Sequence, residues 1–208
     1  MTKKQRYELI RDGLEKAYPD ADCSLKYMDA WELLVSAILA TQCTDKRVNL
    51  VTPALFERYK TVYDFAYASE EEVQEYIRST GFYNHKAKNI IASAQRICSV
   101  YGGVVPDSID ELVTLPGVGR KIANLIIGDI FGRPAIVVDT HAKRLTFRMG
   151  LTKNTDPTKI EMDLLKIIEP QYSSKFCHQL VLLGREYCTA RLPKCENCPA
   201  NSGCKKVL

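Results

Sequence analysis

Hydrophobic residues recur along most of this chain at intervals of three and four, the spacing that lines one face of an α-helix. Residues 4–18 form an amphipathic segment, and residues 31–40 are apolar enough for a largely buried helix. Further helices are predicted, separated by Gly, Pro, Asn and Asp residues, at 46–59, 70–79, 84–101, 107–114, 119–131, 140–149, 157–168 and 173–187. Only residues 134–138 resemble a strand. No series of alternating segments exists to build a sheet, so the pattern predicts an all-α protein.

The composition and charge of the chain indicate an ordinary globular protein but do not identify a binding partner. At 208 residues the chain can form one large or two small domains, and 46% hydrophobic residues are ample for a buried core. The net charge of +4 is compatible with a nucleic-acid partner but too small to indicate one. The N-terminal residues lack the apolar stretch of a secretory signal, and no apolar run approaches the roughly 18 residues of a spanning helix. We therefore expect a cytoplasmic protein without a membrane partner.

Four of the eight cysteines are grouped near the C-terminus, where Cys188, Cys195, Cys198 and Cys204 follow the spacing C-x6-C-x2-C-x5-C. A reducing cytosol disfavours a disulfide scaffold, so these residues are better interpreted as ligands of a metal or cluster. Zinc sites usually pair two short C-x-x-C turns, whereas this segment has one, so the spacing is less typical of zinc and leaves zinc and an iron-sulfur cluster as alternatives. The scattered cysteines are expected to be small buried hydrophobic residues: Cys23, Cys43, Cys98 and Cys177.

A glycine-containing turn separates two of the predicted helices. Asp107 and Ser108 are good N-caps for a short helix at 109–113, and a second helix begins near Arg120. Between them, Gly117 and Gly119 permit positive φ and close approach of the backbone to a ligand. Their N–H groups and the following helix N-terminus could therefore face a phosphate.

Lys121 lies just inside the second helix. Ile122, Ile126 and Ile130 recur at i+4 and are expected to face the core, which leaves Lys121 outside the apolar stripe. The chemically plain alternative is a tight helix-helix turn carrying a solvated lysine. A nucleophilic lysine must attack as the neutral amine, so for that role we expect Lys121 to be partly desolvated.

Asp139 precedes another predicted helix, in the segment Val138-Asp139-Thr140-His141. Its simplest role is an N-cap that accepts backbone hydrogen bonds. A carboxylate there could also stabilise positive charge or remove a proton in a nearby reaction. We expect His141, one turn into the helix, to have a structural role.

Residues 115–121, LPGVGRK, resemble the helix-hairpin-helix motif of the endonuclease III superfamily of DNA glycosylases. The Val-Asp-Thr-His segment and the cysteine spacing resemble the same family, and the resemblance extends from Trp31 to Cys204. It implies that Lys121 attacks C1′ of a damaged pyrimidine nucleotide, expels the base and nicks the strand by β-elimination through a Schiff base. Asp139 would assist, and the four terminal cysteines would hold one 4Fe-4S cluster.

The resemblance also implies which residues bind double-stranded DNA. Gln42 matches a polar wedge that faces the orphaned base, and Phe82 matches an apolar wedge. Without the family resemblance, Gln42 would be interpreted as a helix C-terminal residue and Phe82 as a core anchor. The remaining implied DNA contacts are Gly117, Gly119, Arg120, Arg191 and Lys194. A monovalent cation is implied on the main-chain carbonyls of Val113, Leu115 and Val118.

The implied architecture is a helical domain at 22–133, with its helix-hairpin-helix at about 107–131, and a cluster domain made of 1–21 and 134–208. DNA would lie across the cleft between these domains. We expect a monomer, associated with the nucleoid in a bacterial cell. One rival is a monofunctional, adenine-type mismatch glycosylase, a family that generally lacks a lysine at the position of Lys121. The other is a non-catalytic iron-sulfur module for DNA binding or electron transfer, which would not need Lys121 and Asp139 together.

Overall fold

The computed structural model describes residues 1–208 and contains helices as its only regular secondary structure, which confirms the all-α prediction. The chain divides into two compact units, one formed by Met1–Cys23 with Gly132–Leu208 and the other by Ser24–Phe131. The expected division at residues 22 and 133 lies beside these boundaries. None of the helices combines the length and the apolar character needed to cross a membrane.

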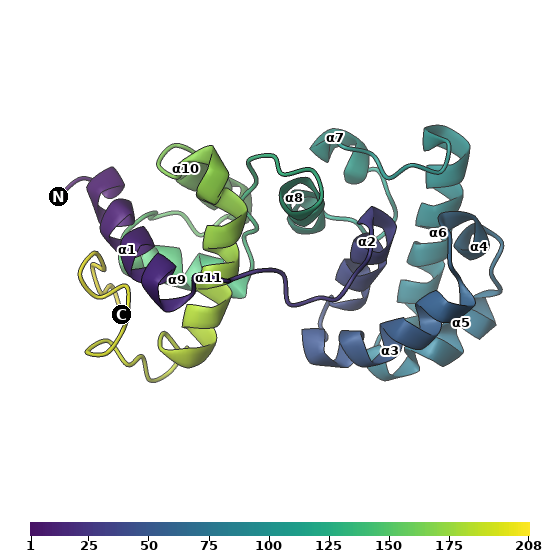
Figure 1. Cartoon of the computed structure of the whole chain (residues 1–208), viewed down its shortest axis with the longest axis horizontal. Coiled ribbons are helices and arrows are strands. Elements are labelled where there is room, and N and C mark those ends of the chain that lie inside the picture. The colour runs from purple at the N-terminus through teal and green to yellow at the C-terminus, as the bar shows by residue number, and fades with distance from the viewer. The chain divides into compact units, whose positions relative to one another are not determined.

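The unit formed by Ser24–Phe131 contains seven α-helices and one 3-10 helix (Figure 1): α2 Ala30–Leu39, α3 Asp45–Arg58, α4 Val62–Ala66, α5 Glu70–Ile77, η1 Arg78–Thr80, α6 Tyr83–Tyr101, α7 Ile109–Leu112 and α8 Arg120–Asp129. The hydrophobic pattern did not predict α4, because one short turn offers too few positions to show a period. A capping box between Thr61 and Asp64 starts this helix. Its Phe65 is fully buried, with its ring 5.3 Å from that of Trp31.

Helix α6 is the 19-residue element against which α4 and α5 pack. Its buried face carries Ile90, Ala94 and Ile97, in the spacing that the sequence predicted for one helical stripe. Helix α2, almost wholly buried, contacts α3, α6 and α8. The core of this unit therefore lies around α2 and α6, and α7 and α8 pack at its edge.

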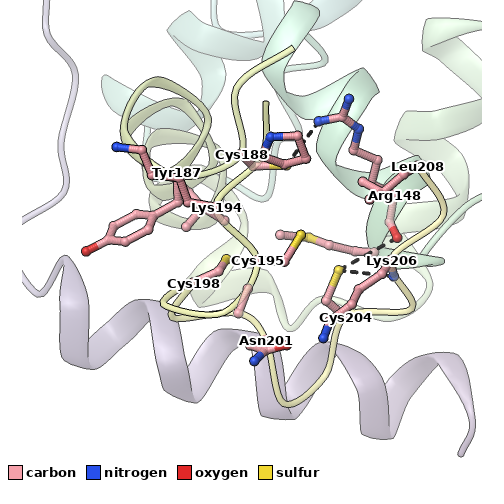
Figure 2. A pocket seen from close by; sticks show the side chains of 14 residues that line it. Arg148, Tyr187, Cys188, Lys194, Cys195, Cys198, Asn201, Cys204, Lys206 and Leu208 are labelled. Atoms are coloured by element: carbon pink, nitrogen blue, oxygen red, sulfur yellow. Dashed lines mark hydrogen bonds between the residues drawn. The ribbon is translucent and has the colours of Figure 1, made fainter. Parts of the chain in front are cut away.

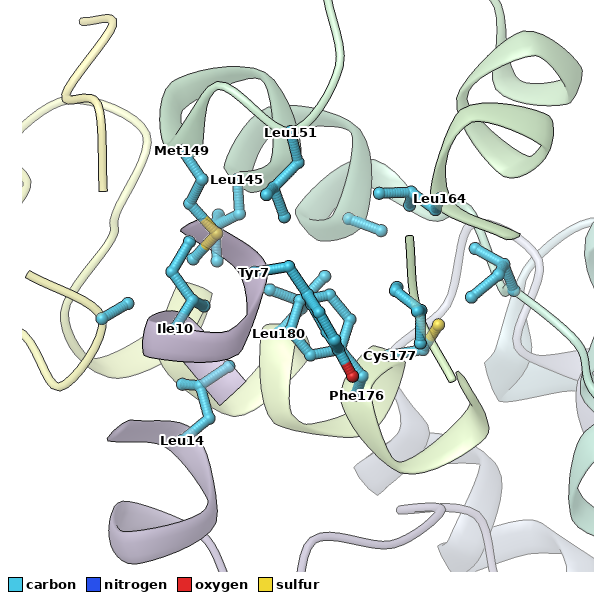
Figure 3. Close-up of a cluster of buried hydrophobic side chains, with 14 of the residues drawn as sticks. Tyr7, Ile10, Leu14, Leu145, Met149, Leu151, Leu164, Phe176, Cys177 and Leu180 are labelled. Carbon is cyan, nitrogen blue, oxygen red and sulfur yellow. The ribbon is translucent and has the colours of Figure 1, made fainter. Parts of the chain in front are cut away.

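The unit formed by Met1–Cys23 and Gly132–Leu208 brings the two ends of the chain together. Its helices are α1 Lys3–Ala17, α9 Thr140–Met149, α10 Pro157–Leu165, η2 Pro170–Tyr172 and α11 Ser173–Glu186. Figure 3 shows the core that these helices share, where Tyr7 and Ile10 of α1 meet Leu145 of α9 and Leu180 of α11. The ring of Tyr7 lies edge-on to that of Phe176, with centroids 5.3 Å apart.

The predicted strand at 134–138 is wrong, because the structure contains no second strand with which it could pair. The segment has no regular secondary structure, and side chains of α11 accept its N–H groups in place of a strand partner. The N–H of Ala135 donates to Ser173 Oγ at 3.1 Å, and the N–H of Val137 donates to Cys177 Sγ at 3.3 Å. These bonds satisfy buried donors without a sheet.

Candidate functional site

The predicted hairpin is present between α7 and α8. Gly117 has φ +79°, and a Cβ there would lie 2.8 Å from Asn89 Nδ2, so both the backbone conformation and the contact require glycine. Gly119 differs from the expectation, because its φ is −91° and any residue could adopt it. It is the N-cap of α8, and no atom lies within 4 Å of the place where its Cβ would be. The backbone of Gly119 is therefore open to a ligand.

Helix α6 supports the hairpin through side chains. Ser93 Oγ donates to the carbonyl of Pro116 at 2.8 Å, and Arg96 Nε donates to Thr114 Oγ1 at 3.1 Å. Ser93 is buried, so its hydroxyl needs this partner. The turn is thus held by a neighbouring helix as well as by its own two helices.

Lys121 is the second residue of α8, and its side chain is exposed. Ile122 and Ile126 are buried as expected, whereas Ile130 is only partly buried. The helix therefore turns its apolar face inward and leaves Lys121 in solvent. The expectation that the protein itself partly desolvates this amine is wrong.

The implied cation site consists of the carbonyl groups of Val113, Leu115 and Val118, whose side chains differ in burial. The side chains of Leu115 and Val118 are buried, whereas that of Val113 is exposed. The Leu115 carbonyl accepts the N–H of Val118 at 3.1 Å. A carbonyl oxygen has two lone pairs, so this bond still leaves Leu115 able to ligate a cation.

Gln42 and Phe82 share an unusual backbone conformation. Their φ values are 53° and 50°, and Lys206 is the only other residue besides glycine with a positive φ. This region costs roughly 1–2 kcal/mol for a residue with a Cβ. Gln42 is exposed beyond the end of α2, and Phe82 is 61% exposed at the start of α6. The interpretation of Phe82 as a core anchor is therefore wrong, and both strained residues point their side chains to solvent.

Asp139 is the N-cap of α9, as its sequence context predicted. Its Oδ1 accepts the N–H of Ala142 at 2.6 Å, and its side chain is half-buried. His141 packs closely against Gly184 of α11, where a Cβ would overlap the imidazole ring. Arg144 Nη2 lies 3.3 Å from His141 Nδ1. These contacts place His141 within the packing between α9 and α11.

The four terminal cysteines line one pocket, part of it open to solvent (Figure 2). Cys188, Cys198 and Cys204 also pack against the hydrophobic core of their unit. As the side chains stand, no three Cys, His, Asp or Glu residues are close enough together to chelate one ion. All four cysteines nevertheless line the same pocket, whose walls also include the apolar side chains of Met149 and Leu183.

Burial raises the pKa of the Cys198 thiol, and the neighbouring cysteine thiols raise it further. Burial raises the pKa of Cys204 in the same way. Because a thiolate is the metal ligand, these sulfurs need a cationic centre to become ionised. The N–H of Lys206 lies 3.4 Å from Cys204 Sγ, and Arg148 Nη1 lies 3.5 Å from Cys188 Sγ. Such donors stabilise ligated sulfur.

Arg148 is a residue of this site that sequence reasoning missed. It reaches from α9 to the loop after Cys188, donating from Nη1 to the Thr189 carbonyl at 2.7 Å and from Nη2 to the Ala190 carbonyl at 2.8 Å. Arg191 and Lys194 are exposed on that same loop. A signal was present, because basic residues in the last turn of a helix often bond nearby carbonyls.

The N-terminal helix α1 also supports the cysteine segment. A Cβ on Gly13 would overlap the carbonyl of Pro199, and one on Gly203 would lie 2.6 Å from the carbonyl of Arg6. Arg6 Nη1 donates to the Gly203 carbonyl at 2.8 Å. The absence of side chains at two glycines therefore allows α1 and the C-terminal segment to touch.

The four scattered cysteines have varied surroundings. Cys177 is buried, which agrees with the expectation, but the other three are only partly buried: Cys23, Cys43 and Cys98. All three lie outside the pocket of the terminal cysteines. They are therefore useful controls for experiments on the terminal group.

Comparison with known proteins places these features together in one family. Residues 35–170 match the family described as HhH-GPD superfamily base excision DNA repair protein. The chain is 48% identical over 198 residues to endonuclease III of Synechocystis sp., covering 95% of this chain and 90% of that protein. It is 40% identical over 207 residues to endonuclease III of Bacillus subtilis, covering 99% and 94%.

Solved structures give the same answer. A structure of endonuclease III trapped as a covalent intermediate with DNA matches with a TM-score of 0.91 and 40% identity, covering 99% of this chain and 97% of that chain. Both the sequence and the structural matches extend over nearly the whole chain. This chain therefore belongs to the endonuclease III family, within the HhH-GPD superfamily of base excision DNA repair proteins.

Proposed function

We propose that this protein acts on double-stranded DNA that carries an oxidised pyrimidine or an abasic site, with Lys121 as its nucleophile. Its family membership makes it a DNA glycosylase with abasic-site lyase activity. The observation that carries the assignment of Lys121 is its place on α8. It is exposed there, two residues after the open backbone of Gly119 and four after the close turn at Gly117.

The hairpin supplies the means to bind a phosphate beside this lysine. The first N–H groups of α8 have no partner within their own helix, and the helix dipole adds partial positive charge. Arg120 is half-buried at the start of the helix and adds a full positive charge. Together with Gly117 and Gly119 it would hold the DNA backbone, and a cation on the Val113, Leu115 and Val118 carbonyls would reinforce that contact.

The proposed reaction begins with the neutral amine of Lys121, which bound DNA would shield from water. Its nitrogen forms a bond to C1′ as the bond from C1′ to the base breaks, and the base leaves with that electron pair and takes up a proton. Opening of the sugar gives a Schiff base between Lys121 and C1′. Loss of a proton from C2′ then expels the 3′ phosphate oxygen and nicks the strand. Hydrolysis of the Schiff base releases Lys121.

Asp139 is proposed to stabilise the positive charge that develops on the sugar. The α9 cap uses its Oδ1, so Oδ2 can serve the reaction. Replacing Asp139 with asparagine should keep the cap, since both residues are good N-caps. We expect base release to slow on the order of 10²–10⁴-fold, while the melting temperature shifts by no more than about 4 °C. A variant that retains full activity would exclude Asp139 from the chemistry.

The cysteines are proposed to hold one 4Fe-4S cluster, because four thiols line one partly apolar pocket and receive hydrogen bonds from neighbouring N–H groups. Such a cluster would supply positively charged iron that keeps the thiolates ionised. This chain's own residues would then hold the C-terminal segment and aim the loop that carries Arg191 and Lys194.

That loop is proposed to contact DNA phosphates, which gives a salt-dependent prediction. Replacing Arg191 and Lys194 with alanine should make the plot of log binding constant against log salt concentration less steep. The slope should become less negative by about 1.8, because each lost phosphate contact accounts for about 0.9. The matched control replaces Lys153 and Lys159, two exposed lysines of the same unit. A slope unchanged by the loop variant would mean that the loop is structural only.

The test of the proposed function is incubation of the protein with duplex DNA that contains one thymine glycol. We expect release of the base and a nick on the 3′ side of the abasic site, with a covalent adduct when borohydride is present. Base release without an adduct would identify a monofunctional glycosylase, and binding without cleavage would identify a non-catalytic module. Because its substrate is DNA, the protein is proposed to work at the nucleoid of a bacterial cell.

A further inference from the structure

Lys86 is a buried lysine that joins two segments distant in the chain. It lies in the first turn of α6 and is 3% exposed. Its Nζ donates to the carbonyl of Leu39 at 2.9 Å and to the carbonyl of Thr80 at 2.8 Å. One ammonium group therefore holds two backbone positions at a fixed separation.

Both of these carbonyls lie a short distance before a strained residue, Leu39 three residues before Gln42 and Thr80 two residues before Phe82. Leu39 is the last residue of α2, and the chain leaves that helix through Gln42. Thr80 is the last residue of η1, and the chain continues through Gly81 to Phe82. Gln42 and Phe82 are two of the three non-glycine residues with positive φ in the whole chain. Lys86 thus holds the starting point of both left-handed turns.

Burying a lysine at this position costs free energy. An ammonium group loses its hydration on burial, and that loss lowers the pKa of Lys86. Methionine has a similar length and would fill the same volume without any such loss. What methionine lacks is a donor for the two carbonyls. The position therefore indicates a function for the hydrogen bonds themselves, because buried polar groups with satisfied partners specify one arrangement of the chain.

We propose that Lys86 is a positioning residue that links the Gln42 and Phe82 turns, so that both side chains enter a DNA duplex together. This inference rests on the proposed function and on the wedge roles that the family resemblance implies for Gln42 and Phe82. An enzyme that extrudes a nucleotide must fill the space left in the stack and separate the opposite base from its neighbours. Two wedges from separate segments can fill the space and separate the bases only if the distance between the wedges stays fixed while the stacked bases oppose their insertion. The two hydrogen bonds of Lys86 maintain it at the base of both turns.

The experiment compares Lys86→Met with Lys88→Met. Lys88 lies on the same helix and is exposed, so its replacement controls for a lost charge and a new methionine. The first readout is the fluorescence of 2-aminopurine placed opposite a stable abasic analogue in duplex DNA, which rises when the opposite base is unstacked. The second is the lyase rate on a true abasic site, measured in a duplex and in a single strand, where no opposite base has to be displaced.

For Lys86→Met we expect the fluorescence change to be lost. The lyase rate on the duplex should fall by roughly 10–100-fold, which is the loss of rate that a small misplacement near a reacting centre causes. The single-strand rate should stay within about twofold of the parent enzyme, because the wedges do not act there. Lys88→Met should match the parent in all three measurements. Equal slowing on both substrates would reveal a general structural role for Lys86 and overturn the inference.

Gln42→Ala and Phe82→Ala separate this inference from the assignment on which it rests. If neither substitution changes the fluorescence, the wedge assignment itself is wrong. If both reduce it and Lys86→Met does not, the wedges stand and the role of Lys86 is overturned. If Lys86→Met does not fold, Lys86→Gln takes its place, because its amide nitrogen is one bond nearer the backbone than the lysine Nζ and does not reach both carbonyls at once. A normal duplex signal in Lys86→Gln would also overturn the inference.

Discussion

Replacing Lys121 with glutamine is expected to abolish the borohydride-trapped adduct and to slow strand nicking on the order of 10⁴-fold or more. Losses of this scale follow when the nucleophile of a covalent mechanism is removed, because glutamine cannot form a Schiff base. Folding should be unaffected, since Lys121 is exposed and its neighbours Ile122 and Ile126 supply the buried contacts of α8. The measurement is gel separation of the trapped adduct, with a parallel assay on DNA that already contains an abasic site.

The control for this prediction is Lys153→Gln, which changes an exposed lysine elsewhere in the chain. Lys86 is the rival nucleophile on chemical grounds, because burial lowers its pKa and so favours its neutral amine. Geometry argues against it, since two carbonyls hold its Nζ and the side chain is 3% exposed. Mass spectrometry of the proteolysed adduct should find the sugar on Lys121. An adduct on Lys86 would contradict the proposed mechanism.

Replacing Cys198 with alanine is expected to prevent binding of the proposed cluster and to release the C-terminal segment from its unit. Metal binding at structural sites contributes on the order of 10 kcal/mol to folding, which rivals the whole stability of a typical domain. Within residues 188–208, Ala200 is the only buried hydrophobic residue, so the attachments left would be the contacts with α1 and a few hydrogen bonds to Arg148 and Met149 of α9. The measurements are iron and sulfide content of the purified protein, together with limited proteolysis of the C-terminal segment.

Cys98→Ala is the matched control for this loss, because Cys98 is a partly buried cysteine of α6 outside the pocket. It should retain iron and sulfide and resist proteolysis like the parent. Full iron content in Cys198→Ala would contradict the ligand assignment. One zinc ion per chain without sulfide in the parent protein would instead identify the alternative metal and keep the structural role of the cysteines.

Much of the candidate site could be predicted because its determinants are local in the sequence. Ser108 and Asp139 are N-caps, as their side chains and the apolar positions after them indicated. The start of α8 at Arg120 and the exposed position of Lys121 likewise follow from a glycine turn and a helical period. The cysteine spacing likewise predicts a shared ligand site, and all four cysteines line one pocket. Caps, turns and periods act within a few residues, so the sequence displays them directly.

Other features became clear only from the folded chain. The hydrophobic period marks which face of a segment is buried, but it does not identify the segment that covers it. The apolar character of Phe82 therefore suggested a core position, whereas the structure exposes it. Residues 134–138 looked like a strand, but α11 satisfies their donors.

The helical class, most helix positions, the family and the residues available for chemistry follow from the amino-acid sequence alone. Tertiary structure decided how distant segments meet: Lys86 with Leu39 and Thr80, Arg148 with the loop after Cys188, and α1 with the C-terminal segment. The physical reason is that these contacts depend on the geometry of several packed helices at once. A buried lysine or a glycine against a distant carbonyl leaves no periodic trace among its neighbours in the chain.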